Sequence, residues 1–446
     1  MRIYLIAAII FSGLYAPEAA EAKVNPRDVT CNFWLLEHPF NTSLKAAPSM
    51  RQSLDLTACA YEAGHKGIAT LVGRDQMSYE NKFWVRLVIG GFDFTFMNMP
   101  FGMAWLHEEW HRAVMSSRDI SSYNEVYNLR IFDDVIKVSH VSDDDLIRLK
   151  KENNPDLVRL AEAGVESSYE LNLRLQKDEF YRETAVYNQI AYAINLLNGI
   201  SYIGSGSTSD SDNIKEEFNE KEDDTKDRDF VGHDFTSWVY DLHRPDEAYE
   251  SRGEHPSGNG IDRYRGWKDL SEKERSFMKL QGQLAYLNIV DPFLLGFSQF
   301  KSELGGETYF WNANLRHHLT SFGYSIQTNF FLKGSSEDSN NFFFSLKGFR
   351  NDRKWFPGLE VDLIDYALSS DNMLTVRLLA WQQPREQSFY SGQSSAGGLL
   401  GIDYARTLGE TFDFLAGIEG KTAGWVAGNP YLNKNLTLRT GLAARL

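Results

Sequence analysis

The spacing of hydrophobic residues changes along the chain and divides it into two unlike parts. Between positions 143 and 197, apolar residues recur with the period of a helix, so this stretch predicts a block of amphipathic helices. From Tyr309 to the end, apolar and polar residues alternate, with Phe322, Tyr324 and Ile326 sharing one face. The two periods predict an α+β protein, mostly helical at first and antiparallel all-β afterwards.

Cap and break signals divide the helical block into shorter pieces. Ser142 predicts the N-terminal cap of a helix over 143–153, because its hydroxyl can accept a hydrogen bond from the first turn. Asn154, which precedes a proline, predicts the start of a second helix. Gly164 predicts a break in that helix before the pattern resumes.

Two further segments stand apart from this block. Residues 83–96 are rich in β-branched and aromatic side chains around Gly90 and Gly91, which predicts a strand or hairpin bent at the glycines. Residues 205–229 contain little that is apolar, and the part from Asp210 onward holds ten acidic residues against four basic ones. Such a composition predicts a disordered acidic loop.

The alternating region contains eight candidate strands whose polar face is charged. That face carries Arg316, Lys347, Glu360, Asp362, Arg377, Asp403, Asp413, Glu419, Lys421 and Arg439. Charges of both signs inside and apolar residues outside are typical of a transmembrane β-barrel, whose smallest common strand number is eight. The pattern therefore favours an eight-stranded outer-membrane barrel, with a soluble β-domain as the alternative because its strands also alternate.

The first residues look like a targeting signal. Arg2 precedes an apolar run over 3–14, and Ala20-Glu21-Ala22 has the form of a cleavage site. Residues 1–22 therefore predict a secretory signal peptide and an exported protein. The remaining chain divides into a helical domain over 23–300 and the β-domain over 301–446.

Charge and cysteine content limit the classes of partner and the state of the thiols that we expect. The 446 residues carry a net charge of −15, which argues against nucleic acid because nucleic-acid binding requires a basic surface. Cys31 and Cys59 are the two cysteines of the chain, and export into an oxidising compartment favours a disulfide between them. Two buried free thiols are the alternative.

The segment Met103 to Met115, MAWLHEEWHRAVM, carries the clearest chemistry. On a helix, His107 and His111 leave the same face one turn apart. Two neutral imidazoles so placed can bind one Zn²⁺ ion. Glu108, beside the first histidine, can act as a general base toward water at that ion. A catalytic zinc usually has three protein ligands, so a third is expected from the helices that follow.

The five residues from His107 to His111 resemble the HExxH pattern of the zinc metallopeptidases, and a strand before such a helix is the order seen in zincins. A glutamate from a later helix, as in the gluzincins, implies Glu166 as the third ligand, with Glu170 as its alternative. Glu109 and Arg112 depart from the resemblance, because extended HExxH patterns usually hold uncharged residues there.

These features predict an exported zinc-dependent hydrolase, a peptidase acting on peptide or protein substrates and anchored in a bacterial outer membrane. A periplasmic location is the alternative. Two other functions remain open: a zinc-dependent deacylase of lipids or glycolipids at the same membrane, and a non-enzymatic outer-membrane structural or binding protein.

Overall fold

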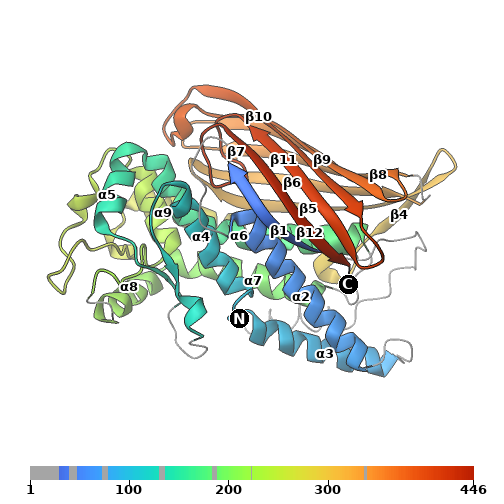
Figure 1. The fold of residues 1–446 in the computed structure, drawn as a ribbon. Coiled ribbons are helices and arrows are strands. Elements are labelled where there is room, and N and C mark those ends of the chain that lie inside the picture. Colours follow the sequence, from blue (N-terminus) through green and yellow to red (C-terminus); the bar gives the residue numbers. More distant parts are fainter. Residues whose placement is uncertain are drawn as a thin grey trace.

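The computed structural model describes residues 30–39, 48–72, 79–129, 136–182, 188–221, 224–335 and 339–445. The predicted signal peptide lies outside the described residues. Helices in this part are α2 (Met50–Val72), α3 (Tyr79–Phe96), α4 (Met103–Ser117), α5 (Asp143–Glu152), α6 (Asn154–Tyr181), α7 (Gln189–Gly206), α8 (Asp210–Lys221), α9 (Asp234–His243) and α10 (Glu272–Leu284). Figure 1 shows α5, α8 and α9 beyond one end of a large curved sheet, and α2, α3 and α7 below it.

The long strands are β1 (Thr30–Pro39), β4 (Phe300–Leu304), β5 (Glu307–Thr320), β6 (Gly323–Gly334), β7 (Asn341–Arg350), β8 (Trp355–Ser369), β9 (Asn372–Pro384), β10 (Ser394–Thr407), β11 (Phe412–Lys421) and β12 (Asn435–Arg445). All are antiparallel and follow the order β1-β12-β11-β10-β9-β8-β7-β6-β5-β4. A two-residue pair, β2 (Tyr123–Asn124) with β3 (Val138–Ser139), lies among the helices. The α+β class is therefore confirmed.

The prediction of an eight-stranded barrel confined to residues 301–446 is wrong in two respects. The sheet has ten strands, and one of them, β1, comes from the start of the described chain and pairs with β12. No ladder among the described residues joins β1 to β4, so the sheet is open. Strand pairing over a separation of about four hundred residues leaves no trace in local periodicity, which explains why β1 was missed.

The two faces of the sheet have the polarity that the alternation predicts. Side chains on the concave face meet α6: Lys177 pairs with Asp362 at 2.8 Å, and Arg182 pairs with Asp365 at 3.1 Å. On the convex face, large apolar side chains are exposed to solvent on strand after strand. They include Phe33, Phe330, Leu346, Leu359, Leu378, Leu400, Phe414, Ile418, Leu436, Leu438 and Leu442. The sheet is therefore charged inside and apolar outside.

Three local predictions are corrected by the structure. Residues 83–96 are part of helix α3, not a strand, because Phe92 and Phe96 pack on Tyr61 of α2 and Gly90 lies against Ile190 of α7. Tertiary packing overrides the β propensity of that segment.

Helix α6 runs unbroken through Gly164. The glycine brings α6 close to α4 instead of ending the helix.

The acidic stretch is also more ordered than its composition predicts. Residues 210–221 form helix α8, where Ser211 is fully buried and the Asp212 carboxylate accepts a hydrogen bond from Lys268 N at 2.9 Å. Contacts with the segment 267–269 supply the partners that the composition alone could not reveal.

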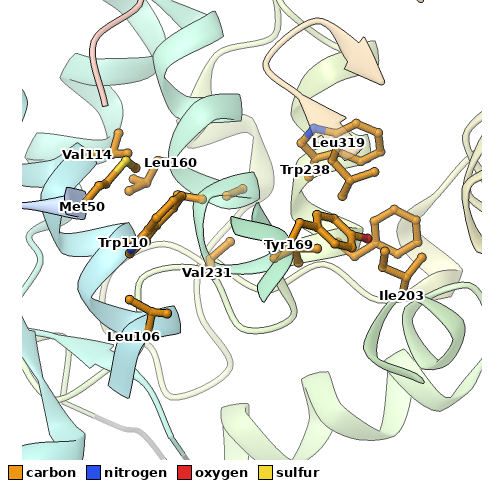
Figure 2. Close-up of a cluster of buried hydrophobic side chains, with 14 of the residues drawn as sticks. Met50, Leu106, Trp110, Val114, Leu160, Tyr169, Ile203, Val231, Trp238 and Leu319 are labelled. Carbon is orange, nitrogen blue, oxygen red and sulfur yellow. The ribbon is translucent and has the colours of Figure 1, made fainter. Parts of the chain in front are cut away.

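The helices share one apolar core around α4, α6 and α9. Met50, Trp110 and Leu160 meet on one side of it, and Tyr169 and Trp238 meet on the other (Figure 2). Burying such large side chains stabilises the fold by about 1.5–3 kcal/mol each.

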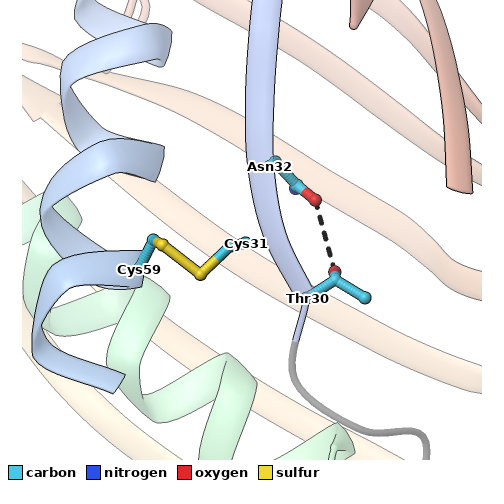
Figure 3. The surroundings of a disulfide bond; sticks show 4 residues. All are labelled: Thr30, Cys31, Asn32 and Cys59. Atoms are coloured by element: carbon cyan, nitrogen blue, oxygen red, sulfur yellow. Dashed lines mark hydrogen bonds between the residues drawn. A yellow bond between two sulfur atoms is a disulfide. The ribbon is translucent and has the colours of Figure 1, made fainter. Parts of the chain in front are cut away.

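The edge strand β1 is held covalently to this helical unit. Cys31 and Cys59 form a disulfide between β1 and α2, as predicted (Figure 3). Gln52 of α2 also donates a hydrogen bond to the carbonyl oxygen of Trp34 at 2.7 Å. Helix α2 thus covers part of the strand edge that would otherwise be unpaired.

Candidate metal centre

Helix α4 carries both histidines and is fixed at its start by a close backbone approach. A Cβ on Gly102 would lie 2.1 Å from the carbonyl oxygen of Phe96, so only glycine fits between the end of α3 and the start of α4. The helix is buried on most sides. His107 and His111 lie on its face toward α6, with their ring centroids 4.9 Å apart. The predicted helix and the shared face are confirmed.

A third donor comes from the first residue of α9. The Oδ2 atom of Asp234 lies 2.8 Å from Nε2 of His107 and 3.2 Å from Nε2 of His111. One ligand atom from each of the three residues lies within 4.8 Å of the others. Asp234 is itself held by Tyr202 of α7, whose hydroxyl accepts a hydrogen bond from the Asp234 backbone N–H at 3.1 Å. Four helices therefore converge on one cluster of two nitrogens and one oxygen.

Gly164 of α6 leaves the space beside these donor atoms. A Cβ at that position would lie 2.3 Å from Nε2 of His107 and 2.3 Å from Nε2 of His111. Any other residue would press directly on both nitrogens. The donor set and this space fit a small metal ion, since nitrogen and carboxylate oxygen are the donors that Zn²⁺ takes in catalytic sites.

The cluster is strongly polarised. Burial raises the pKa of the Asp234 carboxyl, but His111 and His107 outweigh burial and hold that pKa well below its usual range. Burial lowers the pKa of His111, but the Asp234 carboxylate more than compensates and raises it to about 9. Burial lowers the pKa of His107. Asp234 is thus a carboxylate at neutral pH, and the cluster attracts positive charge.

Glu108 lies beside the cluster and is buried among other charged groups. Its side chain is 6 % exposed, and burial raises the pKa of its carboxyl well above the ordinary value. His111 acts against that rise, while Asp229 and Asp234 add to it. A cation bound at the histidines would favour the carboxylate form, because an opposite charge nearby stabilises it. Glu108 has the environment of a general base whose strength depends on the metal.

Glu109 and Arg112, the two charged residues that depart from the HExxH resemblance, form an ion pair with each other. Arg112 donates to Glu109 at 2.6 Å, and the amide of Asn124 donates to the same carboxylate at 2.9 Å. Asn124 belongs to strand β2 and caps the short helical turn that follows it, so its hydrogen bond to Glu109 links α4 to β2. Glu109 is buried with partners and does not disturb the packing around the histidines.

The structure does not bring Glu166, the predicted third ligand, into the cluster. Its carboxylate pairs with Arg159, and its Oε1 accepts a hydrogen bond from Gly428 N at 2.7 Å. Glu166 therefore ties α6 to the β11–β12 connection. Glu170, the alternative, lines a cavity between α6 and the sheet instead of the histidine cluster. Both glutamates leave α6 on sides away from the two imidazoles, because Gly164 occupies the position that faces them.

Sequence reasoning missed Asp234. It lies 123 positions after His111 along the chain, and the distance between them in the structure is set by packing of α9 on α6. A weak signal existed, because the polar and aromatic segment from His233 to Trp267 has the composition of a binding loop.

His233, next to Asp234, is a further buried polar group at this place. Its ring stacks on Tyr202 with centroids 4.4 Å apart, and neither ring nitrogen has a hydrogen-bond partner in the described part of the chain. Burial lowers the pKa of His233 to about 4, so the imidazole is neutral at physiological pH.

Comparison with known proteins adds no assignment. The chain matches no family model, no curated protein and no solved structure. In the described residues, none of the helices combines the length and the apolar character needed to span a membrane.

Proposed function

We propose that the protein is an exported zinc-dependent hydrolase, a peptidase, with His107, His111 and Asp234 as the metal ligands. One observation carries the proposal: two imidazole nitrogens and a carboxylate oxygen meet within 4.8 Å, and the glutamate of the HExxH pattern is buried next to them. Asp234 replaces Glu166 in the role that the gluzincin resemblance implied.

Each residue has a defined task in this reaction. A bound zinc ion would polarise the substrate carbonyl and lower the pKa of water at the site. Glu108 accepts the proton of the attacking water and then delivers it to the leaving amine. His111 is oriented through its Nδ1–H, which donates to the carbonyl oxygen of Leu160 at 2.7 Å and turns Nε2 toward the cluster. Tyr202 orients Asp234, because its hydroxyl accepts a hydrogen bond from the Asp234 backbone N–H.

The choice of zinc rests on Glu108. Two histidines and one carboxylate are also the donors of non-haem iron(II) sites. An iron site of that kind needs no carboxylic acid beside the metal, whereas hydrolysis needs a group that takes a proton from water. The buried glutamate next to His107 therefore favours the hydrolytic metal.

The exposed apolar face of the sheet supports anchoring in an outer membrane. Leu346 in the middle of β7 is 64 % exposed, while its neighbour Ser345 is fully buried. A protein in water gains nothing from this arrangement, because apolar surface of this extent is unfavourable there. In a bilayer the same face contacts acyl chains, as in outer-membrane proteins. Insertion also requires that the unpaired edges of β1 and β4 are covered there, because open sheet edges do not occur in the hydrocarbon region.

Metal analysis with matched variants tests the proposal. The purified protein is expected to contain one zinc per chain, and His111→Ala is expected to contain none. Glu108→Gln should keep the zinc and lose hydrolysis of a library of quenched fluorescent peptides by about 100-fold or more. Iron in place of zinc would contradict the hydrolytic assignment.

The same experiment separates the other two functions. Zinc with no peptide cleavage, but with release of fatty acid from a membrane extract that Glu108→Gln abolishes, would identify the deacylase. A protein that binds no metal under any condition would identify the non-enzymatic outer-membrane protein.

A further inference from the structure

The helical unit with the metal centre is attached to one end of the sheet. The chain leaves β1 at that end and returns to β4 after residue 299, so helices α2 to α10 form one insertion between two strands. The two longest connections that link neighbouring strands directly are also at this end. They are residues 385–393, between β9 and β10, and residues 422–434, between β11 and β12.

Hydrogen bonds tie helices α6 and α9 to this end of the sheet. The indole of Trp238 in α9 donates to the carbonyl oxygen of Thr320 at 3.0 Å, where β5 ends. The hydroxyl of Tyr390 donates to the carbonyl oxygen of His243 at the end of α9, at 2.9 Å. The indole of Trp425 donates to Glu162 of α6 at 2.6 Å. Helix α9 carries the ligand Asp234, so the centre is fixed to this end of the sheet.

At the opposite end of the sheet, the tight-turn end, the connections between strands are two to six residues long. Gly305 and Gly306 join β4 to β5, both with positive φ of 64° and 86°, and Ser370 with Asp371 joins β8 to β9. The β10–β11 connection at the same end is also short, over 408–411. The helical end also has two short connections, 321–322 and 351–354, but the two longest ones and the helical unit all lie there. Outer-membrane proteins likewise carry short turns on the periplasmic side and longer loops outside.

The interior of the sheet separates the metal centre from the tight-turn end. The second half of α6 lies there, bound to the strands by the pairs Lys177–Asp362 and Arg182–Asp365. A cavity of about 220 Å³ remains beside it, but its lining includes none of His107, His111 and Asp234. His107, with its side chain 20 % exposed, is the most accessible of these ligands, and it lies on the helical unit.

We infer that the metal centre faces the outside of the cell and acts on peptides and proteins presented there, not on periplasmic ones. The inference rests on the proposed function, because it requires the sheet to be embedded in the outer membrane. It specifies where the substrates come from. They are peptides and proteins that reach the centre from the medium or from the cell surface, without passing through the sheet.

Two single-cysteine variants test the orientation. Gly392→Cys lies in the β9–β10 connection, where a Cβ meets nothing within 4 Å, and Ser370→Cys lies in the exposed β8–β9 turn. The native cysteines are joined in a disulfide and do not compete for the probe. Bacterial cells that export the full chain are treated with a membrane-impermeant biotin maleimide, before and after permeabilisation of the outer membrane.

Gly392→Cys is expected to be labelled in intact cells, and Ser370→Cys after permeabilisation alone. The reverse pattern, or labelling of neither variant before permeabilisation, overturns the inference and leaves the zinc peptidase and its anchor standing. Cell fractionation of the wild type is done first. Recovery of the wild type in the soluble periplasmic fraction contradicts the anchor itself, and with it the orientation.

Discussion

The Nδ1 atom of His111 lies 2.7 Å from the carbonyl oxygen of Leu160. A carbonyl can only accept, so the imidazole donates through Nδ1 and presents Nε2 to Asp234 and Gly164. The contact joins α4 to α6 at the point where a metal ligand must be oriented. Helix α6 therefore contributes to the centre through its backbone and its glycine, not through the glutamates that follow.

Substitutions at Asp234 and at Glu166 test which of the two residues is the third metal ligand. Asp234→Ala is expected to weaken zinc binding by more than about 100-fold, because it removes a direct ligand. Glu166→Gln is expected to keep the zinc but to lower the free energy of unfolding by about 1–3 kcal/mol, since buried Arg159 loses one of its two carboxylate partners and keeps Glu162 at 2.8 Å. Zinc titration by competition with a chelator, together with urea unfolding, measures both. Loss of zinc in Glu166→Gln alone would return the ligand role to that glutamate.

A methyl group added at Gly164 should weaken zinc binding. Gly164→Ala places a Cβ 2.3 Å from both Nε2 atoms, so the imidazoles must move and zinc binding is expected to fall by at least about tenfold. Gly199→Ala in α7 is the matched control, because its Cβ meets nothing nearer than 3.9 Å. Circular dichroism checks that both variants fold, and equal zinc affinity in the two would refute the proposed site.

Zinc affinity should depend on pH in a defined direction. The pKa of His111 is raised to about 9, so the imidazole carries a proton at neutral pH that zinc must displace. Apparent affinity is therefore expected to rise by about tenfold per pH unit from pH 7 toward pH 9 and then to level off. Isothermal titration in buffers of different ionisation enthalpy measures the proton release. A flat profile over this window would show that zinc displaces no proton from His111.

The disulfide should stabilise the junction of strand and helix without taking part in the metal site. It closes a loop with a sequence separation of 28, and Cys31→Ser is expected to lower the free energy of unfolding by about 3–4 kcal/mol. Zinc content should not change, because Cys31 and Cys59 join β1 to α2 and are not in the metal cluster. Urea unfolding of the wild type with and without reductant gives the same comparison without a mutation.

A charge on the convex face tests the membrane anchor. Leu346→Arg, in the middle of β7, is expected to cost about 2–4 kcal/mol of membrane stability if that face contacts lipid. Leu71→Arg is the control, since Leu71 is 88 % exposed but lies on helix α2 and not on a strand of the sheet. The yield of folded protein in the membrane fraction is the readout. Equal yields from both variants would speak against lipid contact at β7.

Much of the architecture follows from local patterns. The change from a helical to an alternating period separates α5–α7 from the strands, and Ser142 caps α5 through a hydrogen bond from Asp145 N at 3.1 Å. The spacing of His107 and His111 places both imidazoles on one face of α4. Such features depend on neighbours within one or two turns, and the sequence displays those neighbours directly.

The sequence by itself pointed to the two histidines on one face of α4, to Glu108 beside them and to the alternating polarity of the sheet. Tertiary structure decided that β1 joins the sheet, that residues 83–96 form a helix, and that Asp234 is the third donor in place of Glu166. The physical reason is common to all three. Each depends on a partner distant in the chain, β12 for β1, α2 for α3 and α4 for Asp234, and such partners meet only when the whole core packs.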